Sequence, residues 1–77
     1  MTYWVQYSFS YQTPFDNGEN RKWVVESDFG SGRFHCRKKD IKKEVETYIL
    51  EEELYDIEFR DLRVTIIESY ATTDTEV

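Results

Sequence analysis

The longest regular pattern in the chain is an alternation of apolar and polar residues close to its N-terminus. In residues 2–12, TYWVQYSFSYQ, the odd positions are apolar and nearly all even positions are polar. This two-residue period predicts a β-strand with one buried face. Trp4 is the exception, because it adds a large ring to the polar face. The core-facing row is predicted to be Tyr3, Val5, Tyr7, Phe9 and Tyr11.

A second strand is predicted after a turn that contains the pair Asn17-Gly18. Asn-Gly between two extended segments is typical of a hairpin, because both residues tolerate positive φ. The second strand is expected at residues 21–29, RKWVVESDF. Its alternation separates Trp23, Val25 and Phe29 from Val24, Glu26 and Asp28, and we expect the latter three on the same face as Trp4.

Gly30-Ser31-Gly32 then breaks the alternation. A glycine loop that holds phosphate, with Arg33 nearby, is one interpretation. The chain, however, has neither the dinucleotide-binding fingerprint nor the lysine spacing of a P-loop. We therefore favour a bulge or tight turn where only glycine fits. Residues 34–36 are expected to continue the second strand briefly.

Residues 40–54, DIKKEVETYILEEEL, form the one long segment with a helical period. Asp40 is predicted to cap the helix N-terminus. Leu50 and Leu54 fall roughly opposite the main apolar stripe. Either the helix ends early and Leu54 folds under it, or the two leucines form an outer pair available to a partner. At about 100° per residue, the main stripe contains Ile41, Val45, Tyr48, Ile49 and Tyr55.

The last strand is predicted at residues 62–70, LRVTIIESY, with Leu62, Val64 and Ile66 towards the core and Tyr70 as a candidate fourth. A helix between the second and third strands lets the third strand lie antiparallel beside the first. We therefore expect an α+β fold, a two-layer β-β-α-β sandwich. Its three-stranded antiparallel sheet has the order 2-1-3, with one helix packed on one face.

The domain is expected to span residues 1–70, and residues 71–77 are expected to form a frayed C-terminal tail. The sheet face opposite the helix is expected to be exposed. Three apolar side chains are predicted on that face: Trp4, Val24 and Ile67.

Charge is abundant and unevenly distributed along the 77 residues. The net charge is −6, and this argues against direct binding of DNA or RNA. Six of the ten basic residues lie between Arg33 and Lys43, and eleven of the sixteen acidic residues follow position 43. The basic cluster Arg33–Lys43 is either a set of solvated charges, which we favour, or a binding surface for an anion or an acidic partner.

The residues that usually carry chemistry are scarce. The single cysteine, Cys36, cannot form an internal disulfide, and with His35 alone beside it there is no ligand set for zinc. His35 has no nucleophile at a recognisable spacing. We expect no enzyme activity, no cofactor and no metal. A cytoplasmic protein without a membrane partner is expected, because the sequence has no signal peptide and no apolar run of about 20 residues.

The sequence therefore favours a small acidic protein–protein interaction module, with a protein partner or a second copy in a homodimer. The candidate partner-binding residues are Trp4, Val24, Ile67, Leu50 and Leu54. The alternative is an acidic nucleic-acid mimic, in which Glu51, Glu52 and Glu53 imitate phosphates and block a host nucleic-acid enzyme. Bacteriophage inhibitors of restriction or CRISPR machinery act in this way, and the chain is similar to them in size, acidity and compactness.

Overall fold

The structure is a computed structural model that describes residues 1–16, 18 and 20–72. It contains three strands, β1 (Thr2–Asp16), β2 (Arg21–His35) and β3 (Arg60–Ala71). Between β2 and β3 lie a 3₁₀ turn (η1, Lys38–Asp40), the helix α1 (Ile41–Tyr48) and a π turn (η2, Ile49–Glu53).

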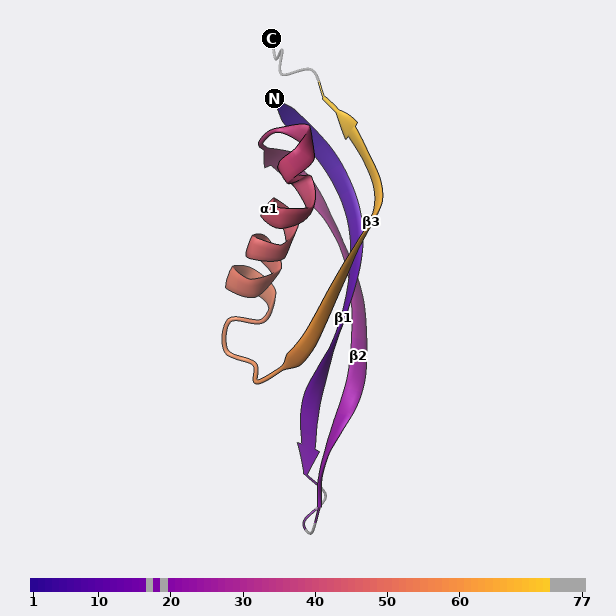
Figure 1. Ribbon diagram of the computed structural model, residues 1–77, viewed down its shortest axis with the longest axis vertical. Helices are drawn as coiled ribbons and strands as arrows, with labels where there is room; N and C mark the ends of the chain where they lie inside the picture. The colour runs from indigo at the N-terminus through magenta and orange to yellow at the C-terminus, as the bar shows by residue number, and fades with distance from the viewer. Residues whose placement is uncertain (17, 19, 73–77) are drawn as a thin grey trace.

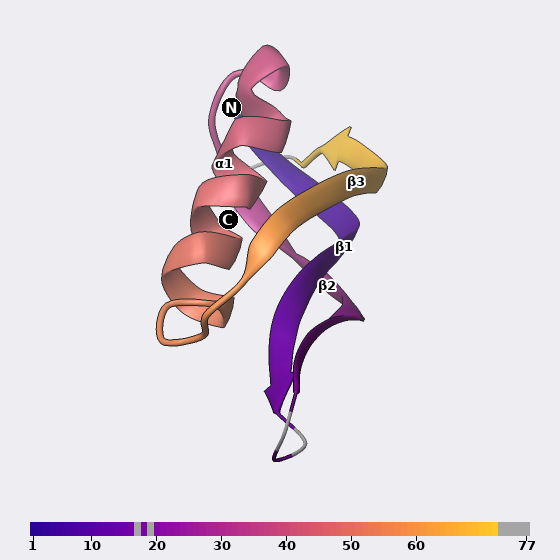
Figure 2. The ribbon, with the colours of Figure 1, turned by 60° about the horizontal axis from the view of Figure 1, so that its bottom comes forward.

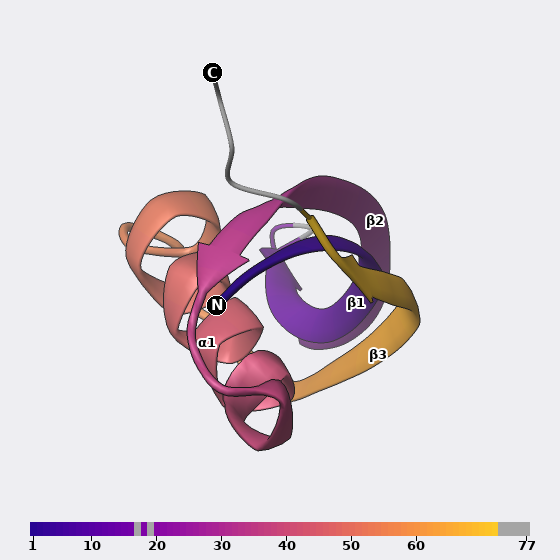
Figure 3. The same cartoon turned by 90° about the horizontal axis from the view of Figure 1, so that it is seen from above.

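The predicted α+β architecture is confirmed. The strands form one antiparallel sheet in the order β2-β1-β3, and α1 packs on one face of it. Figures 1 and 2 show the helix on one side of the sheet and no other element on the opposite side among the described residues. Seen from above, the sheet is strongly coiled, as the right-handed twist of long strands requires (Figure 3).

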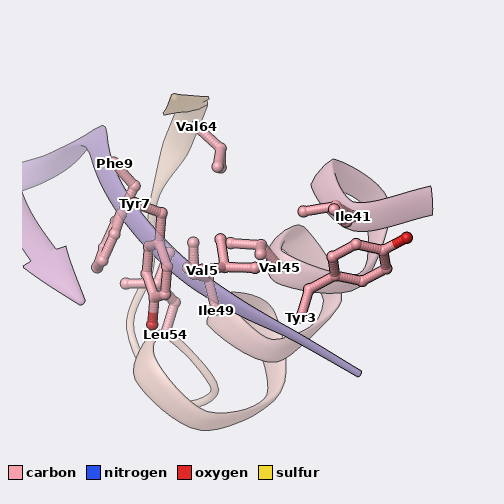
Figure 4. Close-up of a cluster of buried hydrophobic side chains, with 9 residues drawn as sticks. All are labelled: Tyr3, Val5, Tyr7, Phe9, Ile41, Val45, Ile49, Leu54 and Val64. Carbon is pink, nitrogen blue, oxygen red and sulfur yellow. The ribbon is translucent and has the colours of Figure 1, made fainter. Parts of the chain in front are cut away.

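The core lies between α1 and the central strand β1. As the alternation predicts, Tyr3, Val5, Tyr7 and Phe9 are buried, and they meet a helical stripe from the other layer (Figure 4). Burial of apolar surface stabilises the fold by about 25 cal/mol per Å². The remaining buried core residues are Ile41, Val45, Ile49, Leu54 and Val64.

The expected break at Gly30-Ser31-Gly32 is absent, because β2 runs without interruption from Arg21 to His35. Gly30 pairs with Tyr7, and the Tyr7 ring lies directly over it. A β-carbon at Gly30 would be only 2.7 Å from Tyr7 Cε2 and closer still to Cζ and the hydroxyl oxygen. Gly30 is therefore part of a regular strand and forms no turn, and its lack of a side chain leaves room for the Tyr7 ring.

The prediction of which β2 residues face the helix was wrong, because the two faces of the strand are reversed in the structure. Directly paired residues share a face, and Val24, Glu26 and Asp28 pair with Thr13, Tyr11 and Phe9 on the helix side. Val24 is therefore on the opposite face from Trp4. The residues of β2 that share a face with Trp4 are the odd-numbered ones: Arg21, Trp23, Val25, Ser27, Phe29, Ser31, Arg33 and His35.

The end of the helix resolves the alternatives for its two outer leucines. Leu54 is buried with 3% exposure, whereas Leu50 is 42% exposed. In a regular helix Leu54 would lie about 140° from Ile49. The backbone instead forms a π turn, in which Leu54 N–H donates to Ile49 O at 2.9 Å. The wider turn rotates Leu54 back into the core, so it is not a surface residue.

Several smaller expectations for the helix and the last strand were wrong. Asp40 occupies the N-cap position of α1 as predicted, but its side chain makes no capping hydrogen bond and pairs with Arg37, whose Nε lies 3.1 Å from Asp40 Oδ2. Tyr48 and Tyr55 lie outside the buried stripe, with exposed fractions of 42% and 75%. Tyr70 pairs with Trp4 and is exposed, so it does not face the core.

The β1–β2 hairpin projects beyond the helix, and the chain measures 58 × 20 × 18 Å (Figures 1 and 2). The part of the hairpin near its turn is joined by polar contacts to the segment before β3. Thr13 Oγ1 donates to Glu58 O at 3.0 Å, and Arg21 forms an ion pair with the Glu58 carboxylate. The Arg60 guanidinium lies 4.2 Å from the centre of the Trp23 ring. These contacts brace a ribbon that would be marginally stable alone.

Two sequence predictions fall partly outside the described residues. In the predicted Asn17-Gly18 turn, Gly18 has a φ of 99°, and Asn17 lies outside the described residues. At the other end, β3 continues to Ala71, and Thr72 N–H donates to Thr2 O at 2.9 Å. Regular hydrogen bonding thus enters the predicted tail, whose residues 73–77 are not described.

Candidate interaction surface

The sheet face turned away from α1, here called the outer face, is built from the even-numbered residues of β1 and the residues paired with them. Trp4 lies opposite Arg33 on β2 and Tyr70 on β3. Ser8 lies opposite Phe29 and Thr65. The first of these rows combines two large rings with an arginine, and the second combines one ring with two small polar side chains.

Large apolar side chains are exposed on the outer face. Phe29 is 75% exposed and Val25 is 65% exposed, while Tyr70 and Ile67 are each about half exposed. Trp4 is half-buried. Exposed aromatic and aliphatic side chains on one continuous face are typical of protein–protein contact surfaces.

A shallow, open depression of about 390 Å³ lies in the middle of this face. Hydroxyl groups, the Phe29 ring and the Arg63 guanidinium surround it, so it offers both apolar contact and hydrogen bonds. The outer-face residues that line it are Ser8, Ser10, Ser27, Phe29, Arg63 and Thr65.

Ile67 lies in a β-bulge of β3, and its neighbour Ile66 pairs with Tyr7 on the helix side, so alternation places the Ile67 side chain on the outer face. The pair Gln6–Glu68 is followed by the pair Tyr7–Ile66, so Ile67 is an extra residue on β3. A second irregularity lies between Ser10 and Gln12 of β1, where Asp61 of β3 has a φ of 57°. Such bulges increase the twist of the strand.

The two faces of the sheet differ in charge. In the rows paired with Trp4 to Ser10, the outer face carries Arg33 and Arg63 against one carboxylate, Glu68. The helix side instead carries Glu26 and Asp28, which the exchanged register of β2 brings there. These outer-face rows thus carry one more positive than negative charge, in a chain of net charge −6.

The pKa values of two tyrosines on the helix side are raised by burial and by nearby carboxylates. Burial, followed by the charge of Glu53, raises the pKa of Tyr7 above its ordinary value. Burial, followed by the charges of Glu26 and Asp28, raises the pKa of Tyr11. Carboxylates from β2 and from the end of η2 therefore act on the same region, although they are more than twenty residues apart in sequence.

His35 ends β2, and Cys36 follows it directly. His35 Nδ1 lies 3.0 Å from Thr2 Oγ1 in a cross-strand hydrogen bond. Burial, with smaller contributions from Glu44 and Asp40, raises the pKa of the Cys36 thiol. A raised pKa keeps the thiol protonated near neutral pH, and a protonated thiol is a poor nucleophile.

The structure unites only part of the predicted site. Trp4 and Ile67 share the outer face, Val24 lies on the helix side and Leu54 is in the core. Leu50 is exposed on the helix. Glu51, Glu52 and Glu53 are exposed in η2, away from the outer face.

Val25, Phe29 and Tyr70 on the outer face were missed. The positions of Gly30 and Gly32 in the sequence could have predicted the placement of Val25 and Phe29. Bulky rings on the core-facing side of β1 need small partners, so Gly30 and Gly32 should occupy the helix side. The even positions of β2 then face the helix, and Val25 and Phe29 face outwards.

Within residues 1–16, 18 and 20–72, no three His, Cys, Asp or Glu side chains form a group that could hold a metal ion. No helix in the same ranges is long and apolar enough to cross a membrane. No protein-family model, curated protein or solved structure matches the chain.

Proposed function

We propose that the protein is a non-enzymatic protein–protein interaction module that binds its partner through the outer face. The observation that supports this proposal is the exposure of Phe29, Val25, Ile67 and Tyr70 on a sheet face that no described element covers. Interfaces bury aromatic anchors at their centres and surround them with polar groups. The serines and Arg63 around the depression supply hydrogen-bonding groups between these apolar side chains.

The proposal predicts that replacing outer-face side chains removes partner binding without unfolding the protein. Ile67→Ser and Phe29→Ser are suitable, because both side chains are exposed and their loss leaves the core intact. Tyr55→Ser is the matched control, since its ring is as exposed as that of Phe29 but lies in the loop after η2. Capture of proteins from an extract of the native host is the measurement. If the outer-face variants capture the same proteins as the wild type, the proposal is wrong.

The acidic mimic is a second candidate, favoured by the gathering of carboxylates on the helix side. Besides burial, Asp28 and Glu53 both raise the pKa of Tyr7 and of Tyr11, and Glu26 raises that of Tyr11. Glu51 and Glu52 are adjacent to Glu53 in sequence. An acidic surface of this kind would bind the nucleic-acid channel of an enzyme through charge, and such binding weakens steeply with salt.

The mimic makes a different prediction from the interaction module. Replacing Glu51, Glu52 and Glu53 together with Gln should reduce partner binding at least tenfold at low salt, whereas Ile67→Ser should leave it unchanged. Binding constants measured at two salt concentrations are the test. Binding that is insensitive to salt would contradict the mimic.

A further inference from the structure

The unpaired edge of β2 carries information about the partner. In the described part of the chain β2 pairs only with β1, and fifteen consecutive pairs run without a bulge. Cys36 N–H donates to Met1 O at 3.0 Å, one step beyond the pair Thr2–His35. Backbone groups alternate in direction along an antiparallel strand, so even residues of β2 point to β1 and odd residues point to the free edge.

Phe29 fits this alternation and lies at the centre of the free edge. Its N–H donates to the Asp28 side chain, Oδ1, at 2.8 Å and not to β1. Its ring is the most exposed apolar side chain of β2, at 75%. A long edge with exposed apolar side chains is a template for pairing with another strand.

We propose that this edge is occupied by a second copy of the chain, whose β2 pairs antiparallel with β2 about a two-fold axis at Phe29. The inference rests on the proposed interaction function and adds a second copy of the chain as a partner at the edge that borders the outer face. The two sheets would join into one six-stranded sheet with the order β3-β1-β2-β2-β1-β3. Both copies would use the same surface, as closed two-fold symmetry requires.

The register about Phe29 is self-complementary on the outer face. Residue numbers in each pair add to 58, so Phe29 meets the partner's Phe29 and Ser27 meets the partner's Ser31. Every such pair joins odd residues, whose backbone groups already point to the edge. Aromatic side chains directly opposite each other in a sheet attract, by about 0.2–1 kcal/mol.

The same register also fits on the helix side. Asp28 meets the partner's Gly30, and Glu26 meets the partner's Gly32, and neither glycine carries a side chain of its own. Gly30 is also the residue over which Tyr7 places its hydroxyl group. The Tyr7 hydroxyl could therefore donate to the partner's Asp28. Pairing of the Phe29 backbone would release this carboxylate from the Phe29 N–H.

Neighbouring registers are worse. An axis at Asp28 would place the two Asp28 carboxylates directly opposite each other, and like charges in that position repel. An axis at Gly30 would place Glu26 against the partner's Phe34 and separate the Phe29 rings. The axis at Phe29 also places the projecting part of each hairpin beside the upper half of the partner's β2, so the projecting ribbon gains a neighbouring strand.

Disulfide trapping tests the register. In a background with Cys36→Ser, Glu26→Cys combined with Gly32→Cys should form a covalent dimer under mild oxidation. Residues 26 and 32 would be a non-hydrogen-bonded pair with Cα atoms about 4.5 Å apart, within the range of disulfides. Within one copy they are six residues apart on a strand, about 20 Å, and cannot join. A cysteine at Gly32 is tolerated, because a β-carbon there would be 3.8 Å from Phe34 Cε1.

The matched control is Glu26→Cys combined with Ser31→Cys. Residue 31 faces the outer side and would not meet residue 26, so we expect at least tenfold less covalent dimer. Phe29→Lys provides a test without engineered cysteines, because it places two like charges on the axis at an exposed position. Sedimentation should show a dimer for the wild type at tens of micromolar and a monomer for Phe29→Lys.

A wild-type monomer at about 100 µM, or equal trapping of the two cysteine pairs, would overturn the proposed dimer. The interaction function would survive that result if Ile67→Ser still lost captured proteins. Conversely, trapping without any effect of the outer-face variants on capture would support the dimer and remove the basis for a further partner.

Discussion

The distal end of the Tyr7 ring lies against the α-carbon of Gly30 on the neighbouring strand, so that a β-carbon at Gly30 would overlap it. This cross-strand pair explains why a glycine stands in the middle of a regular fifteen-residue strand. It also sets which residues of β2 face the helix, and it places the Tyr7 hydroxyl group over β2.

Gly30→Ala should therefore lower the free energy of unfolding by about 1–3 kcal/mol, the usual range for overpacking a filled site. Gly32→Ala is the matched control. It lies two residues further on the same face, and its added methyl group would make only an ordinary contact with Phe34. Denaturant unfolding of the two variants measures the difference. Equal stabilities would mean that Tyr7 has another position available to its ring.

Leu54→Ala should destabilise the protein by about 2–5 kcal/mol, because it removes a buried side chain and leaves a cavity. Leu50→Ala, four residues earlier and exposed, should change stability by no more than about 0.5 kcal/mol. The comparison tests the π turn, since a regular helix would place the two leucines on the same outer side. Thermal unfolding followed by circular dichroism is sufficient.

Arg60→Gln should loosen the projecting hairpin. Arg60 stacks on Trp23 at 4.2 Å and its Nε donates to Gln12 Oε1 at 2.7 Å. An exposed cation–π contact contributes about 0.5–1 kcal/mol. We expect faster amide exchange in residues 12–16 and 21–24, with little change around α1. Arg63→Gln, on the outer face of the same strand, is the control and should leave that exchange unchanged.

Stability should fall at alkaline pH because of Tyr7 and Tyr11. The folded protein raises the pKa of both phenols above 10.0, chiefly by burial. The unfolded chain therefore loses these protons first. The stability they contribute is complete below pH 10 and is lost as pH rises through the folded-state pKa values.

Denaturant midpoints at pH 8 and pH 11 measure this loss. Tyr7→Phe should make the decrease smaller, since it keeps the ring over Gly30 and removes the titrating group. Tyr55→Phe, at an exposed ring, should leave the decrease as in the wild type. An identical pH dependence for the wild type and Tyr7→Phe would show that the Tyr7 phenol does not contribute.

Local pattern determined much of this fold. The alternation in residues 2–12 is sufficient to identify a strand and its buried side, because side chains of a strand point to opposite faces at every step. The spacing of Ile41, Val45 and Ile49 likewise identifies the buried stripe of the helix. The order of the elements, with a helix between the second and third strands, leaves few arrangements for the sheet, and the expected β2-β1-β3 order is the one observed.

Tertiary packing determined two features that the local sequence pattern does not specify, the orientation of β2 and the position of Leu54. Which side of β2 faces the helix depends on the fit of Tyr7 over Gly30, a contact between residues far apart in sequence. The position of Leu54 depends on one wider turn, which is favourable only because a core is present to receive the side chain. The outer face consequently carries Phe29, Val25 and Tyr70 in addition to Trp4 and Ile67. The period of β2 fixes that the strand has two faces, and only the neighbouring strand β1 and the helix determine which of them faces the core.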